Sequence, residues 1–263
     1  MKYFLVIPLL LLFAFSQAQP GTMYDTAINK KDGKGRKQGV WKKFYKDGKM
    51  RYSGTFKDDK PIGEFLTYTS DGLLESKLNY FPGGTKAKVW LYHEDGRTVL
   101  AEGQYINKLR DSIWKFYTFD AHLISVGVYK KNKLNGVCKT YYPLSGKINE
   151  EISYTDSIKN GPWKQYYEAG NIKLESQYVN GKMEGLYKTY WDNKNLMIIG
   201  KYVNDYSEGR WVFYKADGKI EKVENYKKGK LIESIEEKDK KFKELEKLLN
   251  TKIPEEQIKN PFE

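Results

Sequence analysis

Large side chains recur along this chain at a spacing of 24 or 25 residues. The recurring set is Trp41, Phe65, Trp90, Trp114, Cys138, Trp163, Tyr187 and Trp211. An aromatic residue or His follows each of them by three residues, and a Tyr or Phe closes each unit fifteen or sixteen residues on. A fixed period of this length is typical of a repeat array, because one unit cannot bury its apolar surface alone. Residues 34–230 are therefore predicted to form one array.

The second and closing positions of the unit are almost entirely aromatic. The second position holds Phe44, Tyr68, His93, Tyr117, Tyr141, Tyr166, Tyr190 and Tyr214. The closing position holds Phe56, Tyr80, Tyr105, Tyr129, Tyr154, Tyr178, Tyr202 and Tyr226. Aromatic residues make up 15% of the chain and yet fill fifteen of these sixteen places, so composition alone does not explain the pattern.

Turn signals divide each unit into two strands. Asp-Gly follows the first aromatic position by about six residues in several units, as at Asp47-Gly48 and Asp71-Gly72. Asp-Gly between two β-rich runs is a strong hairpin signal, since Gly accepts the positive φ that these turns need. The predicted fold is all-β, an elongated antiparallel meander of about eight two-stranded hairpin repeats. The Trp-type row is expected to form the core, and twist should accumulate along the sheet.

The first eighteen residues resemble a secretory signal peptide. Lys2 precedes an apolar run, and Ser16-Gln17-Ala18 has the small-x-small pattern of a cleavage site. The alternative is a retained anchor, but an apolar run of thirteen residues is short for about 30 Å of hydrocarbon. We expect residues 1–18 to be removed, residues 19–33 to be a linker, and the mature protein to be periplasmic or secreted without a transmembrane segment.

The mature chain is predicted to begin at Gln19, because cleavage is expected after Ala18. N-terminal sequencing of protein recovered from the periplasm or the medium checks this. A soluble cytoplasmic product that retains Met1 would contradict it.

The composition changes after the array to Glu, Lys and Leu. Residues 233–250 are predicted to form an amphipathic helix, with Ile235, Phe242, Leu245 and Leu249 on one face. Its expected role is to cover the unpaired edge and the apolar row of the last hairpin. Residues 231–263 are therefore interpreted as a C-terminal helix and tail.

The repeat unit resembles the MORN-repeat variant of bacterial proteins. Residues 161–172 read GPWKQYYEAGNI and residues 178–181 read YVNG, and residues 34–41 are similar in kind. The resemblance covers about three quarters of the chain and implies a β-hairpin repeat fold. It also implies an interaction function, as a scaffold, as a phospholipid-associated repeat or as an antitoxin-like protein. Units three and four depart from it, with Lys88 and Ser112 in place of the glycine before the aromatic position.

The sequence offers no catalytic or metal-ligand constellation. His93 occupies a Tyr position, His122 lies in a turn, and Cys138 replaces a Trp-type residue as a small hydrophobe. No nucleophile has a base at motif spacing, and no glycine-rich stretch has the setting of a phosphate loop. We therefore expect no enzymatic activity and no cofactor.

Lysines and tyrosines form a candidate binding stripe. A lysine follows the first aromatic position in five units, and a tyrosine lies two residues beyond it on the same face. The candidate residues are Lys42, Lys115, Lys139, Lys164, Lys188, Tyr117, Tyr141, Tyr166 and Tyr190. The alternative interpretation is a solvated face on which lysine opposes sheet aggregation.

Three functional hypotheses follow from these features. The first is an exported, non-enzymatic scaffold that binds a protein partner in the bacterial envelope. The second is a module for anionic glycan or lipid headgroups, which the net charge of +12 favours. The third, carried by the resemblance alone, is an antitoxin or immunity-type protein. Nucleic acid is not an expected partner of an exported protein.

Overall fold

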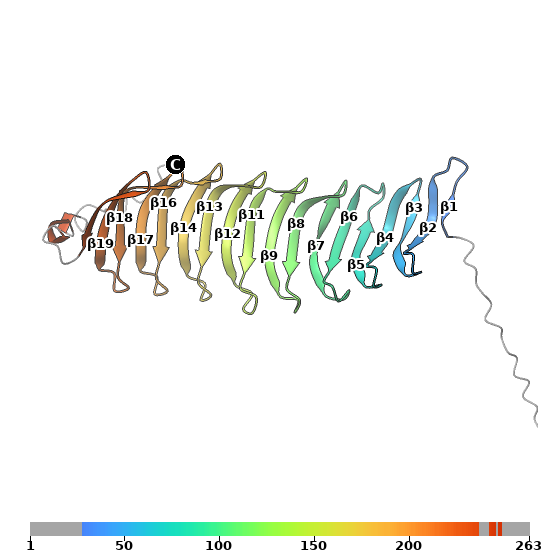
Figure 1. Ribbon diagram of the computed structural model, residues 1–263, viewed down its shortest axis with the longest axis horizontal. Coiled ribbons are helices and arrows are strands. Elements are labelled where there is room, and N and C mark those ends of the chain that lie inside the picture. The colour runs from blue at the N-terminus through green and yellow to red at the C-terminus, as the bar shows by residue number, and fades with distance from the viewer. Residues whose placement is uncertain (1–27, 237–241, 246, 249–263) are drawn as a thin grey trace, which may run out of the picture.

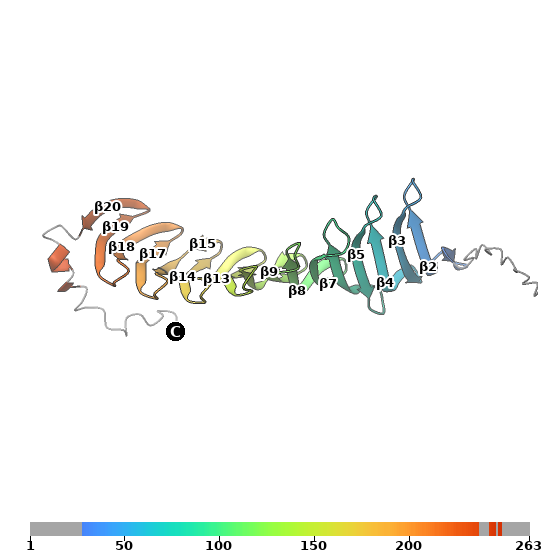
Figure 2. The same ribbon diagram turned by 90° about the horizontal axis from the view of Figure 1, so that it is seen from below.

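The protein is a long, open ribbon of antiparallel β-strands that lie across its long axis (Figure 1). The computed structural model describes residues 28–236, 242–245 and 247–248. These residues form one sheet of 20 strand segments, which confirms the predicted all-β meander. The hairpins change orientation along the ribbon, as expected of a twisted sheet (Figure 2). The predicted signal peptide, residues 1–18, lies outside the described residues.

Each strand pairs with its sequence neighbour. The strands are β1 (Lys30–Lys31), β2 (Lys37–Phe44), β3 (Met50–Lys57), β4 (Lys60–Tyr68), β5 (Leu74–Tyr80), β6 (Lys86–Tyr92), β7 (Val99–Ile106), β8 (Leu109–Tyr117), β9 (Leu123–Lys130), β10 (Lys133–Leu134), β11 (Gly136–Tyr141), β12 (Ile148–Thr155), β13 (Ile158–Tyr166), β14 (Ile172–Val179), β15 (Lys182–Met183), β16 (Gly185–Tyr190), β17 (Leu196–Val203), β18 (Tyr206–Tyr214), β19 (Ile220–Lys227) and β20 (Lys230–Glu236). β10 and β11 both pair with β9, and β15 and β16 both pair with β14, so each couple serves as one interrupted strand. β2 to β19 therefore make eight hairpins, which we call units 1 to 8, with β1 and β20 at the two ends.

Two kinds of turn set the edges of the ribbon. Within a unit, Gly48 has a φ of 86° and its N–H donates to the Tyr45 carbonyl at 3.1 Å, as the Asp-Gly signal predicts. Between units, two consecutive residues have positive φ, such as Asp58 (52°) and Asp59 (64°). This geometry matches the type I′ turn, whose twist suits a hairpin, so short links join most of the units.

Side chains at the turns connect neighbouring units. At the turns between units, the Asp59 carboxylate accepts the Lys37 N–H at 2.8 Å and the Asn132 amide oxygen accepts the Arg110 N–H at 2.6 Å. At the opposite edge, the Tyr45 hydroxyl donates to the Tyr68 carbonyl at 2.7 Å. These bonds span 22 or 23 residues, one repeat length, so both edges stabilise the stacking of units as well as the hairpins.

One side of the sheet, which we call the indole face, carries the Trp-type row and the closing aromatic row. The rings of the two rows alternate and touch, as in Tyr105–Trp114 (5.2 Å between centroids) and Trp114–Tyr129 (6.5 Å). Trp114 is fully buried, with 0% of its surface exposed. The predicted aromatic core is thus a band of ring contacts that crosses unit boundaries.

Glycines on the preceding strand make room for the largest rings. A Cβ on Gly103 would lie 2.4 to 2.6 Å from three atoms of the Trp114 indole, and one on Gly200 would meet Trp211 equally closely. Gly54 stands in the same relation to Phe65. The ring therefore packs directly on the backbone of the unit before it, a contact that the sequence pattern of aromatic residues does not reveal.

The sequence assignment of unit 3 was wrong by one residue. Pairing of β5 with β6 places Val89, with 1% of its surface exposed, in the Trp-type row, and places Trp90 on the opposite face. Tyr92 fills the second aromatic position, and His93 fills the position of Tyr45, with its Nε2 3.3 Å from the Tyr117 carbonyl oxygen. The Asp95-Gly96 turn lies six residues after Val89, which is the spacing of the other Asp-Gly turns from the Trp-type row. The turn spacing therefore indicates Val89, and not Trp90, as the residue of that row.

Unit 3 also lacks the bulge found near the start of most other units. In most units a glycine two residues before the Trp-type row has positive φ, and in unit 4 Ser112 takes this conformation with a φ of 63°. Ala87 occupies this place in unit 3, and the β5–β6 pairing has no register shift. The chain instead spends the extra residues in a longer turn, residues 81–85. The predicted departures in units three and four thus have different structural outcomes.

The C-terminal end differs from the prediction of a helix over residues 233–250. Residues 233–236 belong to β20 and pair with β19, so the expected start of the helix at Glu233 is wrong. Residues 242–245 and 247–248 are helical, and Leu249 lies outside the described residues. Buried Phe242 packs with Val212, Val223 and Ile235, and Leu245 packs against the same cluster. The predicted covering of the last apolar row is confirmed, although Ile235 reaches it from a strand.

We predict that Gly103→Ala destabilises the array by about 1–3 kcal/mol or more, because the added methyl overlaps the Trp114 ring. Gly33→Ala is the matched control, since its Cβ meets nothing within 4 Å and its φ is not in the left-handed region. That control should change stability by less than about 0.5 kcal/mol. Denaturant unfolding of both variants measures the difference. Equal losses would show that the ring does not rest on the glycine backbone.

Candidate binding surface

The side of the sheet opposite the indole face carries one continuous cross-strand row, and we call this side the ladder face. Directly paired residues of neighbouring strands project on the same side of a sheet. In chain order the row is Lys42, Ser53, Leu66, Lys77, Trp90, Glu102, Lys115, Val126, Lys139, Glu151, Lys164, Glu175, Lys188, Ile199, Val212, Val223 and Ile235. Charged residues dominate its middle and aliphatic residues its C-terminal end, where Phe242 covers it.

The structure places all five candidate lysines in this row. Lys115, Lys139, Lys164 and Lys188 occur on every second strand and are separated by Val126, Glu151 and Glu175. Lys42 lies on β2, six positions of the row away from Lys115, with Leu66 and Trp90 among the five residues between them. The stripe therefore has a dense part in units 4 to 7 and an isolated member in unit 1.

Glutamates neutralise most of the dense part. Lys115 lies 3.2 Å from Glu102, Lys139 lies 2.7 Å from Glu151, and Lys164 lies 3.4 Å from Glu175. Among the described residues, the ammonium groups of Lys42 and Lys188 have no ion pair. The lysine row is consequently an alternating ladder of charge rather than a cationic stripe.

The candidate tyrosines extend the same network. The hydroxyls of Tyr117, Tyr166 and Tyr190 donate to Glu102, Glu151 and Glu175 at 2.7, 2.8 and 3.0 Å. Each tyrosine thus reaches back to the glutamate of the preceding unit. The corresponding residue for Tyr141 is Val126, which has no acceptor, and Tyr141 makes no such bond within the described residues. Three of the four candidate tyrosines are therefore fixed in place.

Hydrogen bonds and ion pairs determine the ionisation of this network. The bond from Tyr117, helped by Lys115, holds the pKa of Glu102 below its usual value, and Lys139 with Tyr166 does the same for Glu151. Burial and the adjacent glutamate raise the pKa of Tyr117, Tyr166 and Tyr190 to about 12. At neutral pH Glu102 and Glu151 are therefore anionic, and the three phenols are neutral.

Exposed aliphatic side chains flank the charged ladder. Val40, Ile113, Val137 and Leu186 each precede the Trp-type row by one residue, and all are exposed. Ile113 has 56% of its surface exposed and shares a shallow hollow of about 400 Å³ with Trp90, Glu102 and Lys115. In unit 2 the residue just before the Trp-type row is Glu64. Its ion pair with Lys77, at 2.7 Å, places it on the ladder face as well. The surface thus combines apolar contacts with charges that already have partners.

Sequence reasoning did not identify Glu102, Glu151 and Glu175 as part of the candidate site. The sequence shows only that two carboxylates, Glu150 and Glu151, are adjacent. In the structure Glu150 accepts a hydrogen bond from the Trp163 indole N–H at 2.7 Å on the indole face. Glu151 instead contacts Lys139 on the ladder face. The two point to opposite faces, as expected, but their partners depend on the pairing register of the neighbouring strands on both sides.

The structure also shows the surroundings of the residues considered for catalysis or metal binding. Within residues 28–236, 242–245 and 247–248, no group of three His, Cys, Asp or Glu residues could hold a metal ion. Cys138 is half-buried, and burial raises the pKa of its thiol. Among the described residues no helix is long and apolar enough to cross a membrane.

These features define a β-hairpin repeat protein with a long, polar and apolar face suited to binding. Four segments of the chain match the sequence model of a family described as the MORN repeat variant, at residues 37–58, 159–180, 183–204 and 207–228. The matches cover about a third of the chain, and each coincides with one hairpin, in units 1, 6, 7 and 8. The structure gives the four units between them the same hairpin form.

Similarity to other known proteins is slight. No curated protein matches the sequence. A mutant of TarM from S. aureus, crystallised with fondaparinux and UDP, is 5% identical with a TM-score of 0.29, covering 37% of this chain and 19% of that chain. TcdB2-TccC3 is 11% identical with a TM-score of 0.22, covering 77% of this chain and 14% of that chain. The chain therefore spans a fifth or less of these solved structures.

Stability is predicted to fall as the pH rises from about 10 to about 12. The folded pKa of Tyr117, Tyr166 and Tyr190, about 12, lies above the unfolded value of 10.0. A raised folded pKa contributes stability that is complete below the unfolded pKa and is lost as the pH passes through the folded one. Denaturant melts across this range, with tyrosinate absorbance as the titration signal, measure the effect.

Glu151→Gln provides the control for that titration. The amide keeps a hydrogen-bond acceptor for Tyr166 but removes the negative charge, so the pKa of Tyr166 should fall toward its ordinary value. One tyrosine should then ionise earlier than in the wild type. Superimposable titrations of the two proteins would contradict the proposed coupling.

Proposed function

We propose that this protein is an exported, non-enzymatic repeat scaffold that binds a protein partner through its ladder face. The observation that carries the proposal is the alternation of Lys115, Lys139 and Lys164 with glutamates that neutralise them at 2.7 to 3.4 Å. A surface built to attract an anionic polymer or membrane would present lysines without such partners, because binding then depends on net local charge. The four matched MORN-variant hairpins support the scaffold part of the proposal.

The exposed aliphatic residues strengthen the case for a protein partner. Protein interfaces combine an apolar centre with polar groups that fix orientation. Ile113 and Val137, with 56% and 45% of their surfaces exposed, lie on neighbouring units beside the Lys115 and Lys139 ion pairs. A partner that covers this part of the ladder face would bury both side chains while its own polar groups contact the charge ladder.

Export is the part of the proposal that the N-terminal sequence supports. Lys2, the apolar run and the Ser16-Gln17-Ala18 pattern are typical of a signal peptide. A partner in the periplasm, in the outer envelope or outside the cell is consistent with such a signal. Binding of anionic glycan or lipid headgroups is the alternative hypothesis, supported by the net charge of +12.

The test compares a double variant on the ladder face with a single variant at a hairpin turn, each of which replaces an exposed aliphatic residue by Asp. Ile113→Asp with Val137→Asp introduces charge into the exposed aliphatic row, whereas Leu144→Asp introduces it at a hairpin turn where Leu144 is 88% exposed. The immobilised proteins are then used to isolate partners from envelope extract, with crosslinking to the captured protein. The double variant should weaken capture by roughly fivefold or more, since each hot-spot contact contributes about 1 kcal/mol or more. The turn variant should bind like the wild type.

Two outcomes would favour other functions. Equal capture by wild type and the double variant would exclude the ladder face as the binding surface. Tight binding of wild type to acidic vesicles or acidic polysaccharide, abolished when Lys115, Lys139, Lys164 and Lys188 are changed to Glu and weakened by salt, would support the anionic-ligand hypothesis. The proposal expects no such binding at physiological ionic strength.

A further inference from the structure

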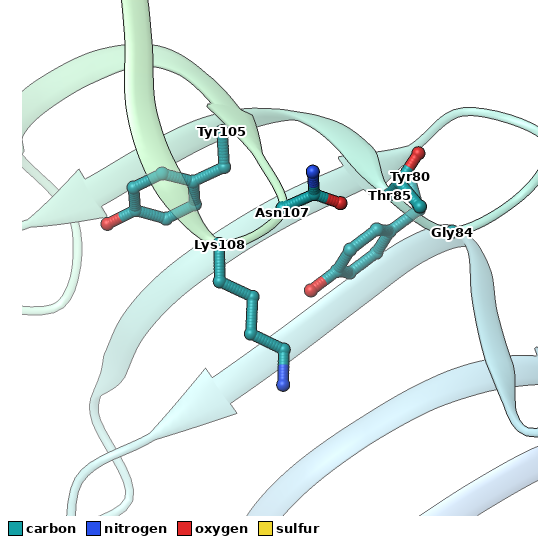
Figure 3. Close-up of a pocket in the computed structure, with 6 residues that line it drawn as sticks. All are labelled: Tyr80, Gly84, Thr85, Tyr105, Asn107 and Lys108. Carbon is teal, nitrogen blue, oxygen red and sulfur yellow. The ribbon is translucent and has the colours of Figure 1, made fainter. Parts of the chain in front are cut away.

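A small pocket opens on the indole face where unit 3 departs from the repeat. Its volume is about 240 Å³, and it is lined by Tyr80, Gly84, Thr85, Tyr105, Asn107 and Lys108. Figure 3 shows the Tyr80 and Tyr105 rings on either side of the Lys108 side chain, with Asn107 at the turn between them. The pocket lies between the long turn before β6 and the turn that joins β7 to β8.

The aromatic band is interrupted beside this pocket. In unit 2, Phe65 fills the space between Phe56 and Tyr80, at 5.6 and 6.1 Å between centroids. In unit 3 the corresponding residue is the aliphatic Val89, which has 1% of its surface exposed. The closing residues Tyr80 and Tyr105 both pair directly with Ala87, which is fully buried. Unit 3 therefore has no aromatic ring of the Trp-type row between its closing tyrosines, and both tyrosines line the pocket.

Lys108 is a second departure at the same place. At the equivalent turn position in other units, Asp59, Asn132 and Ser157 accept a backbone N–H from the preceding turn at 2.6 to 3.0 Å. A lysine cannot accept a hydrogen bond, so Lys108 cannot make this contact. Within the described residues its ammonium has neither an ion pair nor a hydrogen-bond partner. It lines the pocket instead, at a φ of 66° that a lysine adopts at a cost.

The lining groups select a particular chemistry. No carboxylate lines the pocket among the described residues, so the Lys108 ammonium favours an anion. Asn107, Thr85 and the phenol hydroxyls supply neutral donors and acceptors, and burial, with Tyr105 nearby, raises the pKa of Tyr80, so its phenol is neutral. The Tyr80 and Tyr105 rings offer apolar surface to a ring-shaped ligand, and 240 Å³ is below the usual range for drug-sized molecules. A monosaccharide-sized ring with one acidic group fits all these conditions.

We propose that this pocket binds a hexuronate, a sugar ring bearing one carboxylate. The sugar ring packs against the Tyr80 and Tyr105 side chains, the carboxylate pairs with the Lys108 ammonium, and the sugar hydroxyls bond to Asn107 and Thr85. Two departures from the repeat meet here: Val89 holds the Trp-type position of unit 3 beside the pocket, and Lys108 lines the pocket itself. Local exceptions to an otherwise consistent pattern are where functional sites are expected. The site lies on the face opposite the ladder, so it stands or falls independently of the protein-binding proposal.

The experiment measures binding of D-glucuronate to the full chain by calorimetry, with D-glucose and acetate as comparison ligands. Lys108→Asn is the decisive variant, because Asn132 occupies the same turn position in the next unit and the substitution should preserve the fold. Loss of a charge-assisted hydrogen bond should weaken glucuronate binding on the order of 10- to 100-fold. Lys131→Asn is the matched control, since it removes the same charge from a neighbouring turn residue that also has positive φ. That variant should bind like the wild type.

A second variant tests the phenol hydroxyl of Tyr80. Tyr80→Phe keeps the ring and removes the hydroxyl, so it should weaken binding by only about threefold to tenfold. The proposal requires that glucose and acetate each bind at least roughly tenfold more weakly than glucuronate, as expected when either the charge or the ring is missing. It is overturned if glucuronate shows no saturable binding, if acetate or glucose binds as well, or if Lys108→Asn binds glucuronate unchanged.

Discussion

The packing of Phe65, Trp114 and Trp211 on a glycine of the preceding unit is the contact on which the array depends. Trp114 rests on Gly103 and Trp211 on Gly200, so the largest apolar side chain of one hairpin is buried only when the previous hairpin is present. A two-stranded hairpin alone has only marginal stability in water. The ring-on-glycine contact therefore couples neighbouring units and makes stability a property of the series. The hydrogen bonds at both edges, each spanning one repeat, reinforce the same coupling.

The register that this packing requires also arranges the opposite face. Once the Trp-type rings are aligned, the residues beside them fall into one cross-strand row. In the middle of the ribbon that row alternates Lys and Glu, and the tyrosines of the next unit bind the same carboxylates. At the C-terminal end the row becomes aliphatic, and Phe242 buries it. One sheet thus presents a charge-compensated surface along much of its length and closes its apolar end with its own chain.

Unit 3 shows how a repeat tolerates variation without losing its frame. Its residues from Val89 to Asp95-Gly96 keep the spacing of the other units, although the glycine bulge is replaced by Ala87 and a longer turn. The closing tyrosines on either side remain in place, because the strand pairing is continuous through β5, β6 and β7. Both tyrosines line the small pocket at this boundary. A rigid array can place a specific site at one unit in this way, with its neighbours as the scaffold.

The sequence by itself determined the repeat length, the hairpin in each unit, the all-β meander and the aromatic composition of the core. These properties follow from residue spacing and turn chemistry, which can be read directly along the chain. Only the tertiary structure decided which residue of unit 3 faces the core, that Glu102, Glu151 and Glu175 neutralise the lysine row, and that residues 233–236 continue the sheet. Each of these depends on how neighbouring strands pair, within a unit for Lys139 with Glu151 and between units for Lys115 with Glu102. A bulge, or its absence, shifts that register. Ladder partners 11 to 15 residues apart are set by the register, and no local pattern specifies it.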